Sequence, residues 1–147
     1  MNYKFAICDD EIIEIKYLSS LVTKWGKKTD NIAIVSTFED AKSFLFNYAE
    51  NKDYDILLLD IEMSGANPKI HTMNGVELAK QIRTENTSVQ IVFITGFPDF
   101  IAEGYEVSAL HYLMKPVKED KLFEVLNKAV IRLQATPRTI LFSKTGG

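Results

Sequence analysis

The sequence predicts an α/β fold in which a parallel β-sheet is covered by helices on both faces. Short apolar segments alternate along the chain with segments whose apolar residues recur every three or four positions, which is the spacing of one helix face. Two of the apolar segments, Ile56–Leu59 and Ile91–Ile94, are uninterrupted, as expected for strands buried on both faces. Together these observations indicate five successive strand–helix units.

The first two units occupy the amino-terminal third of the chain. Lys4–Cys8 is an apolar run that stops abruptly at acidic residues, and Ile32–Val35 is rich in β-branched residues, so both are predicted strands. Each is followed by an apolar helical stripe. The stripe of the first helix is Ile15, Leu18, Val22 and Trp25. The stripe of the second helix is Ala41, Phe44, Leu45 and Tyr48. We expect the first helix to end at Gly26 and the two lysines after it.

The other three units follow the same pattern. The predicted strands are Ile56–Leu59, Ile91–Ile94 and Tyr112–Met114, the last of which is stopped by Lys115-Pro116. A short helix is expected between Asp99 and Tyr105. The third helix is predicted from Val76, Ala79 and Ile82. The last helix is predicted from Leu122, Val125, Leu126, Ala129, Val130 and Leu133. This spacing makes the last helix long and amphipathic.

The composition is that of a single globular domain. The chain has 147 residues, of which 46% are hydrophobic and 25% charged. Its single cysteine, Cys8, excludes a disulfide framework and favours a cytoplasmic location. No apolar run reaches the roughly 20 residues that span a bilayer, and the net charge of −3 argues against a nucleic-acid surface. We expect one domain over residues 1–135, with a linker and the possible start of a truncated output domain over 136–147.

Polar side chains with reactive groups follow four of the five predicted strands. These residues are Asp9, Asp10, Asp60, Thr95 and Lys115. Because ligands of open α/β sheets bind beyond the carboxyl ends of the strands, we expect these residues to share one site. Each also has an ordinary explanation, such as capping of the first helix by Asp9. Four strand ends with such groups on one edge favour the shared site.

The predicted site suits phosphoryl chemistry that depends on a metal ion. Three carboxylates in one place repel one another, and a divalent cation relieves the repulsion. Mg²⁺ takes carboxylate oxygens and also accepts phosphate oxygens. A carboxylate between Mg²⁺ and an ammonium group can act as a nucleophile on phosphorus. The sequence holds no Walker loop, no dinucleotide-binding glycine motif and no zinc-ligand cluster that would indicate another chemistry.

The order and spacing of these residues resemble the receiver domains of two-component response regulators. The resemblance runs from about residue 3 to residue 134. The motifs that carry it are Asp9-Asp10, Leu57-Leu58-Leu59-Asp60-Ile61-Glu62-Met63, Met73-Asn74-Gly75, Thr95-Gly96 and Tyr112-Leu113-Met114-Lys115-Pro116. It implies a flavodoxin-like, doubly wound sheet of five parallel strands in the order 2-1-3-4-5, with helices on both faces.

The resemblance also implies a role for each site residue. Asp60 would be the phosphoacceptor, and Thr95 and Lys115 would bind the phosphoryl oxygens. The implied Mg²⁺ ligands are Asp9 (directly or through water), Asp10, Asp60 and the backbone carbonyl of Glu62. Such a domain is a phosphoacceptor and not an enzyme with a substrate of its own.

The carboxyl-terminal motif suggests how phosphorylation would be read out. By resemblance, Thr95 and Tyr112 form a switch, and Lys115-Pro116 resembles the family's cis peptide bond. The segment Ala109–Pro116 is similar to receivers joined to a LytTR-type DNA-binding domain, and Thr139–Gly147 looks like the opening strand of such a domain. The implied partners are a sensor histidine kinase and, after phosphorylation, a second copy of the chain. DNA would be contacted only through the absent output domain.

Three further features of the sequence lead to expectations. Gly75 follows Asp60 by 15 residues, which is longer than the usual family connection. We therefore expect an insertion within Gly65–Thr72, in a loop where Ser64 replaces the usual proline. We expect this insertion to be a passive surface loop rather than a lid, and its His71 to have no catalytic role. A surplus of apolar residues suggests an output surface for self-association. These residues are Phe97, Phe100, Ile101 and Tyr105.

Other functions remain open at this point. A haloacid-dehalogenase-like phosphohydrolase also forms an aspartyl-phosphate, but it places its nucleophile after the first strand and its acid pair last, whereas here the acid pair comes first. A receiver-like dimerisation module without phosphorylation would be expected to lose part of the set formed by Asp10, Asp60, Thr95 and Lys115. A flavodoxin would need a phosphate-binding loop where the chain has Asp9-Asp10.

Overall fold

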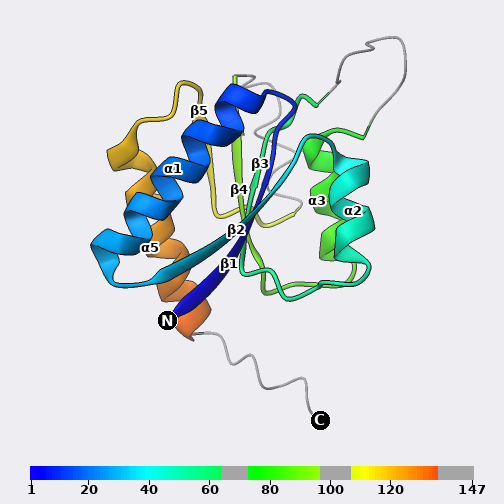
Figure 1. Cartoon of the computed structure of the whole chain (residues 1–147). Helices are drawn as coiled ribbons and strands as arrows, with labels where there is room; N and C mark the ends of the chain where they lie inside the picture. Colours follow the sequence, from blue (N-terminus) through cyan, green and yellow to red (C-terminus); the bar gives the residue numbers. More distant parts are fainter. Residues whose placement is uncertain (64–72, 97–106, 136–147) are drawn as a thin grey trace.

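The computed structural model describes residues 1–63, 73–96 and 107–135 and contains one parallel sheet of five strands (Figure 1). The strands lie in the order β2-β1-β3-β4-β5, which confirms the predicted doubly wound topology. The strands are β1 (Asn2–Cys8), β2 (Ile32–Phe38), β3 (Ile56–Leu59), β4 (Gln90–Thr95) and β5 (His111–Met114). The helices in the described ranges are α1 (Ile12–Thr29), α2 (Ala41–Tyr48), α3 (Gly75–Arg83) and α5 (Glu119–Ala135).

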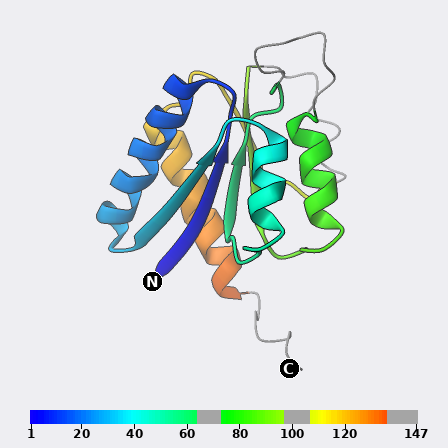
Figure 2. The ribbon, with the colours of Figure 1, turned by 45° about the vertical axis from the view of Figure 1, so that its right-hand side comes forward.

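The helices form two layers, with α1 and α5 on one face of the sheet and α2 and α3 on the other (Figures 1 and 2). Each face of the sheet has its own apolar cluster, and the central strand β3 supplies residues to both. Trp25 of α1 packs against Phe5 in one cluster, and Phe44 of α2 packs against Tyr54 in the other. All four side chains of β3 are buried, which explains its unbroken apolar sequence.

Several of the observed elements extend beyond the bounds expected from sequence. Strand β1 begins at Asn2 and β2 continues to Phe38, because the two strands pair along their full lengths. Helix α1 ends at Thr29, one residue after the end expected over Gly26 and the two lysines that follow it. Gly26 is a packing residue inside the helix. A Cβ atom there would lie only 2.9 Å from the backbone oxygen of Asn31, at the entry to β2.

Contacts between α1 and α5 fix the loop that follows β5. The Tyr17 hydroxyl donates a hydrogen bond of 2.6 Å to the carbonyl of Val117, two residues after Lys115. Further along both helices, Trp25 Nε1 donates to Asn127 Oδ1 at 2.9 Å. The end of β5 is therefore tied to α1, the helix that begins beside the acidic residues after β1.

Several expectations fall outside the described residues. These are the insertion Gly65–Thr72 with His71, the short helix between Asp99 and Tyr105 with its apolar residues Phe97, Phe100 and Ile101, and the segment 136–147. Among the described helices, none combines the length and the apolar character needed to cross a bilayer.

Candidate functional site

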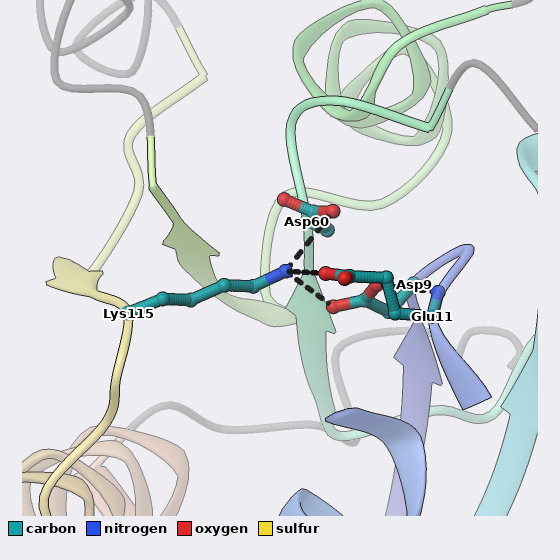
Figure 3. A network of polar contacts seen from close by, with 4 residues as sticks. All are labelled: Asp9, Glu11, Asp60 and Lys115. Atoms are coloured by element: carbon teal, nitrogen blue, oxygen red, sulfur yellow. Dashed lines mark hydrogen bonds and ion pairs between the residues drawn. The ribbon is translucent and has the colours of Figure 1, made fainter. Parts of the chain in front are cut away.

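Four charged side chains meet at the carboxyl edge of the sheet, around the ammonium group of Lys115 (Figure 3). Lys115 Nζ lies 2.9 Å from Asp9 Oδ2, 3.2 Å from Glu11 Oε1 and 3.3 Å from Asp60 Oδ2. Asp9 follows β1, Asp60 follows β3 and Lys115 follows β5, so three strands and the start of α1 supply the group. The predicted convergence of these strand ends is confirmed.

The acidic residues are placed so that they could hold a metal ion. Asp9, Asp10 and Asp60 each offer a carboxylate oxygen, and these oxygens lie within 4.8 Å of one another. Asp9 Oδ1 accepts a hydrogen bond from the backbone N–H of Glu11. Asp9 Oδ2 is buried, and its contact among the described residues is the Lys115 ammonium at 2.9 Å, which leaves one of its two lone pairs available. A buried carboxylate oxygen with this unused capacity, beside two further carboxylates, fits a hard cation such as Mg²⁺.

Burial and mutual repulsion make two of the carboxylates, those of Asp60 and Asp9, easier to protonate. Asp60 is only 4% exposed, and this burial, together with the negative charge of Asp9, raises its pKa from 3.8 to about 7. Burial also raises the pKa of Asp9. Burial by itself would lower the pKa of Lys115, but contact with Asp9 and Asp60 outweighs this effect and raises it. Lys115 is therefore a permanent positive charge in the site.

The raised pKa predicts that the ionised Asp60 destabilises the metal-free fold. The pKa of Asp60 is about 7 in the folded protein and 3.8 in the unfolded chain, so the folded protein loses stability as the pH rises between these two values. At pH 8 without divalent cations, Asp60→Asn is expected to raise the free energy of unfolding by about 2 kcal/mol. The gain should disappear near pH 4. Urea denaturation at both pH values measures this gain. Equal stability of Asp60→Asn and the wild type at pH 8 would contradict the expected destabilisation by the ionised Asp60.

The other predicted site residues lie on the strands beside this group. Thr95 is fully buried at the end of β4, and its carbonyl accepts a hydrogen bond from the Lys115 backbone N–H. Tyr112 on β5 is half-buried, and its ring centre lies 5.1 Å from that of Phe93. The Lys115–Pro116 peptide bond is cis, as expected. Glu62 lies two residues after Asp60, and its carbonyl as a metal ligand stays a prediction.

The Asn74-Gly75 pair fixes the start of α3 against the backbone of Asp60. Asn74 caps α3 by accepting the Glu77 N–H, and the Glu77 carboxylate accepts the Asn74 N–H in return. The Gly75 N–H donates to the carbonyl of Ile61. A Cβ atom on Gly75 would overlap the carbonyl oxygen of Asp60, so only glycine fits this approach.

This close approach predicts a large effect of one added methyl group. Gly75→Ala should lower the free energy of unfolding by about 2 kcal/mol or more, because the backbone at Asp60 must move. Gly96→Ala is the matched control, since a Cβ atom there has no neighbour within 4 Å in the described part of the chain. Thermal or urea unfolding of both variants measures the difference. Equal stability of the two would show that the backbone at Asp60 tolerates the displacement.

Sequence reasoning missed one member of the group, Glu11. Its side chain contacts Lys115, although it belongs to none of the predicted functional pairs. The only signal in the sequence was its position directly after the acidic pair, and that position is equally suited to an ordinary helix start. Asp9, which could have been a helix cap, is instead held against Lys115, and the N-cap residue of α1 is Glu11.

Comparisons with known proteins agree with this architecture. The family model described as "Response regulator receiver domain" matches residues 5–127. The sensory transduction protein LytT of Bacillus subtilis is 30% identical over 122 residues, which cover 83% of this chain and 46% of that protein. The transcriptional regulatory protein YpdB of Escherichia coli is 30% identical over 125 residues, which cover 85% of this chain and 46% of that protein. The chain therefore spans about half the length of these curated relatives.

A solved structure supports the same assignment. The response regulatory domain of protein mrkE from Klebsiella pneumoniae has a TM-score of 0.76 and 26% identity, with 90% of this chain and 99% of that chain covered. A CheY-like receiver domain from Methanospirillum hungatei shares the fold, with a TM-score of 0.75 at 19% identity. With its 2-1-3-4-5 sheet and its acidic group beside Lys115, the chain belongs to the family of response regulator receiver domains of two-component systems.

Proposed function

We propose that Asp60 accepts a phosphoryl group from the phosphohistidine of a sensor histidine kinase. The observation that carries this proposal is the placement of the Asp60 carboxylate, which is buried, 3.3 Å from a lysine ammonium and within 4.8 Å of two further carboxylates. A carboxylate in this setting can act as a nucleophile on phosphorus, because its surroundings balance the charge of the arriving phosphoryl group.

In the proposed step, one oxygen of Asp60 forms a bond to phosphorus as the phosphorus–nitrogen bond of the donor breaks. The leaving imidazole keeps the electron pair of that bond and takes a proton from water. Lys115 Nζ, already beside Asp60, binds a phosphoryl oxygen, and the hydroxyl of Thr95 is proposed to bind another. Asp9, Asp10 and Asp60 would hold Mg²⁺, which when bound supplies positive charge to the oxygens of the transferring group.

The response is proposed to travel through β4 and β5. Thr95 and Tyr112 lie on these neighbouring strands, and Tyr112 is half-buried beside Phe93, where a movement of Thr95 could change its packing. We propose that this change alters self-association and controls an output domain beyond residues 136–147. The relatives LytT and YpdB are named as a sensory transduction protein and a transcriptional regulatory protein, which favours a DNA-binding output and a cytoplasmic location.

The alternatives lose support from the arrangement of the residues. The acid pair follows β1 and the proposed nucleophile follows β3, which is the reverse of the order in dehalogenase-like phosphohydrolases. A receiver-like dimerisation module that is not phosphorylated remains the alternative, and an experiment has to distinguish it from a phosphoacceptor. All four residues of the phosphorylation set are present, and Asp60 and Lys115 are in direct contact.

Intact-mass spectrometry after treatment with acetyl phosphate and Mg²⁺ tests the proposed function. The expected result is one added phosphoryl group per chain, which hydroxylamine removes because it cleaves acyl phosphates. A chain that gains no such group under these conditions would support the dimerisation module instead.

A further inference from the structure

Glu11 makes a contact that its position in the fold does not require. It is the N-cap residue of α1, where a side chain usually accepts a hydrogen bond from the first turn of the helix. Its side chain makes no such bond. Instead, Oε1 accepts a hydrogen bond from Lys115 Nζ at 3.2 Å, 104 residues further along the chain (Figure 3). The carboxylate therefore contributes to the site and not to capping of the helix.

The contact makes Glu11 share the ammonium group of Lys115 with two other carboxylates. In the described part of the chain, the ion pairs of Lys115 are those with Asp9, Glu11 and Asp60. Asp9 and Asp60 are buried, whereas the side chain of Glu11 is 66% exposed, so it lies at the solvent side of the group. A phosphoryl group on Asp60 needs Lys115 Nζ for one of its oxygens, and Glu11 occupies part of the same ammonium.

We propose that Glu11 is a positioning residue that competes with the phosphoryl group for Lys115 and so slows phosphorylation of Asp60. This inference rests on the proposed function. The exposed carboxylate also repels an anionic phosphodonor as it approaches, and both effects have the same sign. Because exposed ion pairs are weak and screened by salt, the expected restraint on the rate is twofold to fivefold.

The test compares initial rates of adduct formation with acetyl phosphate and Mg²⁺, measured by intact mass. Glu11→Gln is expected to react two to five times faster than the wild type. Glu11→Asp, whose shorter side chain cannot keep the contact with Lys115, should also react faster. Glu14→Gln is the matched control, because it removes a negative charge from the first turn of the same helix, outside the ion pairs of Lys115. The increase in labelling rate for Glu14→Gln should be less than half of the increase for Glu11→Gln.

A second readout is the affinity for beryllofluoride in the presence of Mg²⁺, measured by calorimetry. This phosphoryl mimic should bind Glu11→Gln more tightly than the wild type, a gain that a merely loosened structure would not produce. An unchanged or lower rate in Glu11→Gln, or an equal gain in Glu14→Gln, would overturn the inference while leaving the proposed function intact. Absence of any adduct on the wild type would overturn both.

Discussion

The Asp60→Asn protein is expected to gain no phosphoryl group from acetyl phosphate and Mg²⁺. The amide keeps the shape of the side chain but lacks the anionic oxygen that attacks phosphorus. Its contact with Lys115 can persist through the amide oxygen, so the variant should fold. The expected effect is a complete loss of the adduct in intact-mass spectra, at donor concentrations and times that label the wild type fully.

Asp55→Asn is the matched control for this loss. Asp55 and Asp60 stand at opposite ends of β3 and are each 4% exposed, so the two variants change the same group at the same burial. Asp55 Oδ2 accepts the Lys4 N–H, which an asparagine oxygen can also accept. Asp55→Asn should therefore label like the wild type. Labelling of Asp60→Asn at the wild-type rate would show that another residue is the phosphoacceptor.

Removal of divalent cations is expected to abolish phosphorylation. In the described part of the chain, the metal-free site holds the carboxylates of Asp9, Asp10, Glu11 and Asp60 around the ammonium of Lys115, and this excess of negative charge repels an anionic donor. Wild-type protein in excess chelator should show no adduct, and addition of Mg²⁺ or Mn²⁺ should restore it. Equal labelling in chelator would contradict a role for the metal ion.

The two residues of the acidic pair should contribute unequally to metal binding. Asp10→Ala is expected to weaken Mg²⁺ binding more than Asp9→Ala, because Asp10 is the expected direct ligand and Asp9 is already paired with Lys115 at 2.9 Å. Calorimetric titration with Mg²⁺ measures both affinities. Asp53→Ala, an exposed acid before β3, is the control and should bind like the wild type. A larger loss in Asp9→Ala would reverse the assignment.

The sequence predicted those parts of the structure that depend on burial and on residue order. An unbroken apolar run such as Ile56–Leu59 has one stable place in an α/β domain, the centre of the sheet, and the residue that follows it must then lie at the carboxyl edge. The same logic placed Asp60 and Lys115 on that edge, where they are in contact.

The parts that could not be predicted depend on long-range contacts. Gly26 resembles a helix end in the sequence, and only the approach of Asn31 shows why it lies inside α1. Glu11 resembles an ordinary residue at a helix start until Lys115 is seen beside it. Its role depends on Lys115, 104 residues further along the chain, and the local sequence around Glu11 does not indicate this contact.

Chemical trapping of the phosphorylated residue tests the central claim most directly. Wild-type protein is treated with acetyl phosphate and Mg²⁺, reduced with borohydride, digested and sequenced by mass spectrometry. Borohydride reduces an aspartyl-phosphate to homoserine and leaves ordinary carboxylates unchanged. The account predicts homoserine in place of Asp60 and intact aspartate at Asp9, Asp10 and Asp55. Homoserine at another position, or intact Asp60 in protein that carries the phosphoryl adduct, would contradict it.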